Sequence, residues 1–108
     1  MPEQCLIVLT TAPSREEGEA LARQIVERRL AACVNVSARM RSFFRWNDEV
    51  CADEEVQLQI KTTTDGFAPL AAAIRELHSY DLPEILALPV ATGDDDFADW
   101  IRSQVGPQ

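Results

Sequence analysis

The chain has 108 residues, of which 46% are hydrophobic and 26% are charged, and it carries a formal net charge of −8 at pH 7. This length fits one domain, residues 1–108, and this composition excludes the disordered and fibrous classes of protein. The negative charge excludes nucleic acid as an expected partner, because phosphate binding depends on clustered Lys and Arg.

The sequence predicts neither a membrane span nor a secretion signal. No apolar run approaches the roughly 20 residues that a bilayer requires, and residues 1–5, MPEQC, lack the basic and apolar segments of a signal peptide. The three cysteines are odd in number and contain no CxxC motif, so we expect buried free thiols in a reducing compartment. We therefore expect a cytoplasmic protein without membrane contact.

The N-terminal part of the chain predicts a buried strand followed by a helix. Residues 5–9, CLIVL, form the continuous apolar run of a central strand. Ser14-Arg-Glu-Glu17 has the capping-box pattern, in which the Ser14 side chain accepts from the Glu17 backbone and the Glu17 side chain reaches back. The helix that follows has one apolar stripe at 3.6-residue spacing, formed by Leu21, Ala22, Ile25 and Val26.

The middle of the chain predicts two strands. Residues 30–36 begin the first strand, and residues 39–46 are its continuation with alternating side chains. Asn47-Asp48 suits a two-residue hairpin turn, although Asn-Gly would suit it better. Residues 55–61 form the second of these strands, in which alternation directs one set of side chains to the core, namely Val56, Leu58 and Ile60.

The C-terminal part predicts a helix, a strand and a second helix. Apolar residues from Phe67 to His78 recur at helical spacing, and Pro69 is expected in the first turn. Residues 84–90 form an apolar strand, whose internal proline indicates an edge position or a bulge. The last helix starts at the acidic residues 94–96 and ends at Gly106-Pro107. Its apolar stripe consists of Phe97, Trp100, Ile101 and Val105.

The predicted order is strand, helix, strand, strand, helix, strand, helix. Its first six elements match the α+β, ferredoxin-like βαββαβ fold, an antiparallel sheet with helices on one face, here followed by a C-terminal helix. The opposite face of such a sheet has no helices to cover it, and the hairpin at residues 39–53 is long for a small domain. We therefore expect the protein to associate with itself through sheet faces or edges.

His78 is the only histidine, so any imidazole chemistry at neutral pH depends on it. Its place at the end of an apolar helix stripe is typical of a structural histidine that bonds terminal carbonyls. A role as a metal ligand is the second possibility, and acid-base catalysis is the third. Catalysis has the least support, because the sequence lacks a Ser-His-Asp set, a nucleotide-binding glycine loop and a strong carboxylate pair, so we expect no enzyme.

Glu84 and Cys33 complete the candidate metal ligands. Glu84 follows His78 across a proline-containing turn, and a tight turn would bring the two together. Cys33 lies in an apolar run, where packing as an inert buried thiol is the simpler expectation. These three residues form a metal site only if the fold assembles them, because no HxxH, HExxH or paired-cysteine motif places two ligands on one element.

A basic row is predicted on one face of the strand segment at residues 39–46. It is formed by Arg39, Arg41 and Arg45 in an otherwise acidic chain. Arginine suits bidentate pairing with carboxylates. We expect this row to be solvated or, with slight preference, to meet the carboxylates of a neighbouring subunit.

Several stretches together resemble the CutA family of divalent-cation tolerance proteins. They occur in the family's order and spacing over nearly the whole chain. These stretches are Arg29-Leu-Ala-Ala-Cys-Val-Asn35, Ser42-Phe-Phe-Arg-Trp46, Glu55 to Thr62, His78-Ser-Tyr-Asp-Leu-Pro-Glu84 and Trp100-Ile101.

The resemblance implies a ferredoxin-like protomer in a tight homotrimer, similar in architecture to the PII signalling proteins. It also implies tolerance toward copper or another divalent cation, with His78 and Glu84 matching the family's His and Glu ligands. Thr10 stands where some members have a liganding Cys, and Leu77 where some have a second His. The alternative is a PII-like signalling or scaffold trimer that binds a small anion or a partner protein in its inter-subunit clefts.

Overall fold

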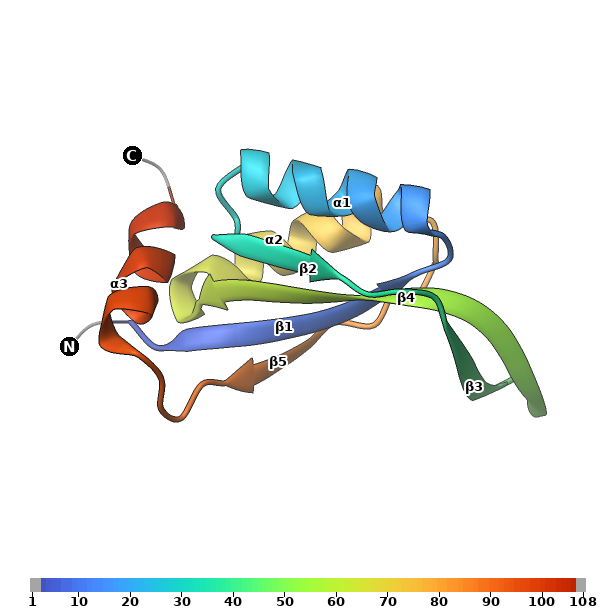
Figure 1. Ribbon diagram of the computed structural model, residues 1–108. Helices are drawn as coiled ribbons and strands as arrows, with labels where there is room; N and C mark the ends of the chain where they lie inside the picture. Colours follow the sequence, from blue (N-terminus) through green and yellow to red (C-terminus); the bar gives the residue numbers. More distant parts are fainter. Residues whose placement is uncertain (1–2, 107–108) are drawn as a thin grey trace.

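A computed structural model describes residues 3–106 of the protein (Figure 1). Eight elements follow one another along the chain, one more than the predicted seven, because the strand expected to continue from residues 30–36 into residues 39–46 is interrupted and forms two strands. They are β1 (Cys5–Ala12), α1 (Arg15–Glu27), β2 (Cys33–Val36), β3 (Met40–Trp46), β4 (Glu49–Thr63), α2 (Thr64–Leu77), β5 (Leu86–Pro89) and α3 (Asp95–Gln104). Pro107, part of the predicted stop of the last helix, lies outside the described residues.

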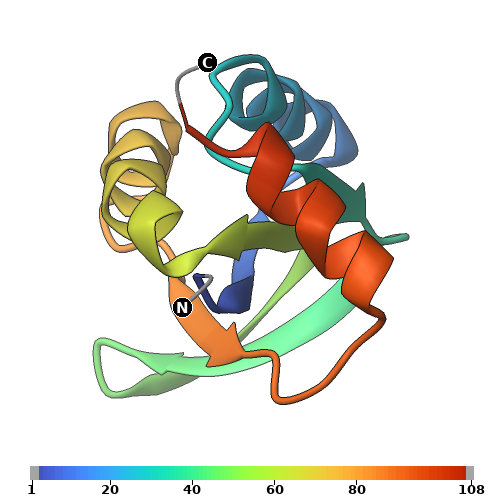
Figure 2. The same ribbon diagram turned by 90° about the vertical axis from the view of Figure 1, so that its left-hand side faces the viewer.

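The five strands form one antiparallel sheet. Its order is β2-β4-β1-β5, and β3 pairs with the outer part of β4. Helices α1 and α2 lie side by side over one face, as Figures 1 and 2 show together. The predicted ferredoxin-like α+β fold is therefore confirmed, with β5 at a sheet edge, where its proline removes no ladder hydrogen bond from a central strand.

The core lies between the sheet and these two helices. Val56, Leu58 and Ile60 are 1%, 0% and 0% exposed, as their alternation predicts. Val8 of β1 faces Ile60 across the ladder and is equally buried. The α1 stripe adds Leu21 and Ile25, and the α2 stripe adds Leu70 and Ile74.

The other sheet face is open and partly apolar. It carries the residues that alternate with the core residues along each strand. On this face Leu9 of β1 pairs with Leu86 of β5, and Ile7 of β1 pairs with Leu88 of β5. Leu86 and Leu88 are 57% and 49% exposed. A run of large apolar side chains left in water is typical of an interaction surface.

Strands β3 and the outer part of β4 form an arm that extends beyond the sheet (Figure 1). Asn47 and Asp48 make the predicted two-residue turn, with φ angles of 50° and 64°. Both φ angles are positive, as a type I′ hairpin turn requires. The arm exposes four large apolar side chains, those of Phe43, Phe44, Trp46 and Val50.

The helix starts agree with the sequence in two cases and differ in one. Ser14 Oγ accepts a hydrogen bond from the Glu17 backbone at 3.1 Å, and Asp94 Oδ2 accepts one from Phe97 at 2.9 Å. The expected position of Pro69 in the first turn of its helix is wrong. Because the Thr63 side chain caps α2 at the Gly66 backbone, the helix begins before the apolar stripe and Pro69 falls in the second turn.

Helix α3 lies across one end of the sheet (Figures 1 and 2). Arg29 holds its C-terminal end by donating from Nε to the Gly106 carbonyl at 2.9 Å. Of the predicted apolar stripe, Ile101 is 5% exposed, whereas Phe97 and Trp100 remain about half exposed. The described residues include no helix long and apolar enough to cross a bilayer.

Candidate functional site

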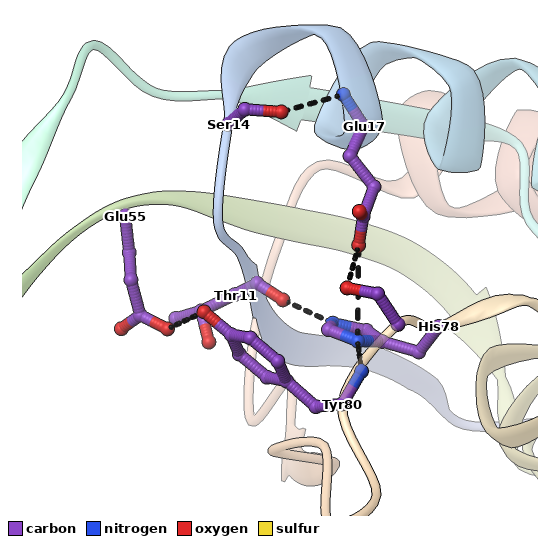
Figure 3. Close-up of polar contacts among 7 residues, drawn as sticks. Thr11, Ser14, Glu17, Glu55, His78 and Tyr80 are labelled. Carbon is purple, nitrogen blue, oxygen red and sulfur yellow. Dashed lines mark hydrogen bonds and ion pairs between the residues drawn. The ribbon is translucent and has the colours of Figure 1, made fainter.

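His78 ends α2 and lies at the junction of α1, β1 and the following loop (Figure 3). Its side chain is fully buried. Its Nε2 atom lies 2.6 Å from the Thr11 carbonyl oxygen, and its Nδ1 atom accepts from the Tyr80 backbone N–H at 3.0 Å. Because Nδ1 accepts, the proton of the neutral ring is on Nε2, which donates to Thr11. Both ring nitrogens are thus occupied by backbone groups.

Glu17 joins this junction from the first turn of α1. Its Oε2 atom accepts from Ser79 Oγ at 2.7 Å and lies 4.0 Å from His78 Nδ1. The carboxylate therefore points to the loop after α2, and the described structure records no return bond from it to Ser14. Only the Ser14 half of the expected capping box is present.

Tyr80 connects the same loop to the arm. Its ring lies against that of His78, with centroids 4.6 Å apart, and its hydroxyl donates to Glu55 Oε2 at 2.8 Å. Burial and the neighbouring Glu55 carboxylate raise the pKa of Tyr80 above its ordinary value. The phenol is held neutral as a donor.

A cavity of about 880 Å³ opens between this loop and the arm. One wall is the strand face of β3 that carries Met40, Ser42, Phe44 and Trp46, and the other is the loop from Ser79 to Glu84. Four carboxylates line it, those of Asp53, Glu55, Asp81 and Glu84. Among residues 3–106, no Lys or Arg side chain lines it.

The electrostatics of this acidic groove, defined by the lining residues above, favour positive charge. Burial, and then the charge of Glu55, raise the pKa of Glu84. Glu55 is only 9% exposed, and its Tyr80 bond uses one of its two oxygens. Two carboxylates therefore repel each other across a cavity wide enough to admit a ligand.

The structure places His78 and Glu84 at the two ends of one short loop but keeps Cys33 apart. Cys33 begins β2, at the sheet edge opposite the one formed by β5. It is half-buried, as is Cys51, so the expectation of buried thiols holds only for Cys5. Within one protomer, the described part of the chain contains no group of three His, Cys, Asp or Glu side chains positioned for a metal ion.

The sequence alone does not single out Glu55 or Glu17 as functional residues. Glu55 alternates with the core residues of its strand, which predicts an exposed carboxylate, and its burial comes from Tyr80 in a loop 25 residues away. The sequence pattern predicts only a capping-box role for Glu17, whereas its carboxylate contacts Ser79 in the structure. The absence of basic residues near Asp53 and Glu55 in the sequence was the available signal for an acidic surface.

A family model described as "CutA1 divalent ion tolerance protein" matches residues 6–104. The chain belongs to the CutA family. The divalent-cation tolerance protein CutA of Thermus thermophilus is 45% identical over 100 residues, which are 93% of this chain and 97% of the relative. A solved structure of that organism's protein superposes with a TM-score of 0.93 at 44% identity, covering 94% and 99% of the two chains.

A second CutA structure, from Archaeoglobus fulgidus, superposes with a TM-score of 0.91 at 37% identity and covers 94% and 99% of the two chains. That protein is described as a periplasmic divalent cation tolerance protein. Because the matches extend over nearly the whole chain, the long arm and the loop from His78 to Glu84 belong to the matched region.

Proposed function

We propose that this CutA-family protein acts in divalent-cation tolerance by binding copper or another divalent cation, as a single-domain homotrimer in the cytoplasm. The observation that carries the proposal is the pair of carboxylates Glu55 and Glu84, which line one groove to which residues 3–106 contribute no Lys or Arg side chain. A divalent ion would neutralise their mutual repulsion. The role is one of binding, and no catalytic step is invoked.

Glu84 is the proposed ligand at the groove, with Glu55 beside it. His78 and Cys33 are the proposed nitrogen and sulfur donors, which copper prefers to carboxylates. His78 requires a rearrangement for this, since a free Nε2 lone pair means giving up the contact with the Thr11 carbonyl. Cys33 requires a second subunit, because β2 and β5 form opposite edges of the sheet.

The homotrimer is supported by the open sheet face and the extended arm. The apolar residues of that face, among them Leu86 and Leu88, need cover from another molecule. A second copy of the chain offers the same apolar surface. In a closed ring of copies, the open sheet face of each copy is covered by its neighbours.

The alternative function, a signalling or scaffold trimer that binds an anion, has less support. A second cavity, of about 690 Å³, lies beside the start of α1 and contains Arg15 and Arg39. Arg15 is 2.8 Å from Glu19, and Arg39 is 3.4 Å from Glu54. These pairings leave little free positive charge for an anion.

Calorimetric titration of Cu²⁺ and of Zn²⁺ tests the metal proposal. We expect a saturable site in the wild type that is weakened at least tenfold in Glu84→Gln and unchanged in Glu76→Gln, an exposed carboxylate on α2. Loss of the site in His78→Ala, with the fold verified by circular dichroism, assigns the imidazole, and loss in Cys33→Ser assigns the thiolate. A wild type without any saturable site contradicts the proposal.

A further inference from the structure

Helix α3 exposes an aromatic pair at the end of the molecule opposite the arm (Figure 1). Phe97 and Trp100 are 50% and 42% exposed, and their ring centroids lie 5.4 Å apart. The only buried residue of this helix is Ile101. Exposed rings keep their apolar area in water, so two neighbouring rings on one helix are typical of a contact surface.

The charge beside these rings is negative. Asp96 precedes Trp100 by four residues, so the two side chains lie one turn apart on the same side of α3. Asp94 caps the helix, and Asp99 lies 3.0 Å from Arg102. Asp96 has neither a hydrogen bond nor an ion pair from its side chain to another described residue. A partner for this surface therefore needs apolar area and a positive charge.

The arm carries that combination. Phe43 is the most exposed of its rings, at 70%, and the guanidinium of Arg41 lies 5.7 Å from the Phe43 ring centroid. The residue opposite Arg41 in the ladder is Glu54, whose carboxylate lies 3.4 Å from Arg39. Arg41 thus has no ion pair within the described part of the chain. The cation and ring on the arm complement the carboxylate and rings on α3.

The arm and α3 of one chain cannot meet each other. They lie at opposite ends of a molecule whose longest dimension is 46 Å (Figure 1). A contact between them therefore joins two copies, and it is head-to-tail because each surface meets one of the other kind. Head-to-tail contacts close into a ring when the rotation between copies permits, as a homotrimer requires.

Contacts between two identical surfaces are less suitable. Two arms placed together would bring Arg41 of each copy to the same interface, and two α3 helices would do the same with Asp96. Like charges brought together at an interface cost free energy. Charge complementarity thus favours the contact of an arm with a helix α3.

We propose that the arm of one copy docks on helix α3 of the next copy, with Phe43 against Phe97 and Trp100 and with Arg41 beside Asp96. This contact rests on the homotrimer proposed above and names the two surfaces that meet at each of its junctions. Each copy gives one arm and receives one. Helix α3, which follows the six elements of the ferredoxin-like fold, is thereby the receptor for the arm.

Charge reversal on each surface tests the proposal. Arg41→Glu and Asp96→Arg are each expected to weaken association at least tenfold, because each replaces attraction by repulsion. The double variant Arg41→Glu/Asp96→Arg restores an attractive pair, and we expect its association to return to within about threefold of the wild type. Sedimentation of a dilution series measures this, in a fixed urea concentration that partly dissociates the wild type.

Asp95→Arg is the matched control. Asp95 is exposed in the same first turn of α3, so its replacement loses the same interaction with the helix dipole, but it lies on a different side of the helix from the rings. We expect it to leave association unchanged. Single variants that associate like the wild type, or a double variant no stronger than the singles, overturn the proposal.

Trp100 fluorescence gives a second and independent measurement. The chain has two tryptophans, so Trp46→Phe leaves Trp100 as the only one. If an arm covers α3, addition of Arg41→Glu uncovers the ring. We expect its emission to shift to longer wavelength and its quenching by acrylamide to increase. Emission and quenching that stay the same would show that no arm lies on α3, which overturns the proposal.

Light scattering separates this proposal from the one on which it rests. A wild-type monomer contradicts the homotrimer and the arm contact together. A wild-type trimer that persists unchanged in Arg41→Glu and Asp96→Arg supports the homotrimer and overturns the arm contact alone. The metal titrations use other residues, so divalent-cation binding stands or fails separately.

Discussion

The Nε2 atom of His78 lies 2.6 Å from the carbonyl oxygen of Thr11, 67 residues earlier in the chain. This contact joins the end of α2 to the end of β1, while Nδ1 of the same ring holds the backbone of Tyr80. One buried imidazole thus positions the loop that forms a wall of the acidic groove. Its first role in the molecule is structural.

Replacement of His78 by alanine should destabilise the protein. The change leaves the Thr11 carbonyl and the Tyr80 amide without their partner and opens a cavity, so we expect a loss of about 2–4 kcal/mol in the free energy of unfolding. Urea denaturation at fixed protein concentration measures it. Glu76→Ala, exposed on the same helix, is the control and should cost under about 0.5 kcal/mol. Equal stability of the two variants would show that the ring contributes little.

Replacement of Glu84 by glutamine should stabilise the protein near neutral pH. A pKa of Glu84 raised in the folded state means that folding favours the protonated carboxyl. The stabilisation that protonated Glu84 gives the folded protein is therefore complete below the ordinary pKa of 4.5 and is lost as the pH rises. At neutral pH the wild type therefore bears the cost of the charge, and glutamine does not. The half-exposed position limits the gain to on the order of 0.5 kcal/mol.

Thermal unfolding at two pH values checks the sign of this effect. The advantage of Glu84→Gln should be present at neutral pH and vanish below about pH 4, where Glu84 is protonated. A wild type that is more stable than the variant at neutral pH would mean that the charge of Glu84 is already balanced. The groove would then have no unbalanced negative charge to attract a cation.

Gly18 is a test of the packing between α1 and the sheet. A Cβ atom there would lie 2.8 Å from Val56 Cγ2. Alanine gains about 1 kcal/mol in helix propensity, but overpacking against a side chain that is 1% exposed costs about 1–3 kcal/mol. We expect Gly18→Ala to lower the denaturation midpoint. Gly93→Ala, whose nearest atom would be 3.8 Å away, should leave it unchanged, and a midpoint raised by Gly18→Ala would contradict this packing.

Arg41 tests whether the basic row on the arm takes part in assembly. It is exposed within one protomer and faces away from the acidic groove. If the row meets carboxylates of a neighbouring subunit, Arg41→Glu replaces attraction by repulsion and should weaken association at least tenfold. Analytical ultracentrifugation over a dilution series measures this, with Arg23→Glu on the exposed side of α1 as the control. Identical dilution curves would mean that the row is only solvated.

The sheet and its covered face could be predicted because their signals are local and periodic. Val56, Leu58 and Ile60 alternate with polar residues, and this spacing permits only one face to be buried. The Ser14 cap is equally local, since donor and acceptor are three residues apart. Pro69 was misplaced because the apolar stripe starts later than the helix that Thr63 caps.

The groove could not be predicted, because its contacts join distant parts of the chain. Glu55 meets Tyr80 across 25 residues, and His78 meets Thr11 across 67. Alternation assigned Glu55 to solvent, and only the tertiary fold brings a loop over it. The expectation of a structural role for His78 at a helix end agrees with the geometry, although its partner is a strand carbonyl and not one of the helix.

The central claim is that copies of this chain cover the open sheet face, on which Leu86 and Leu88 are about half exposed. Size-exclusion chromatography with multi-angle light scattering at micromolar concentration tests it most directly. We predict a single species of three times the chain mass, and a shift to smaller species in Leu88→Glu. A monodisperse monomer of the wild type would contradict the account.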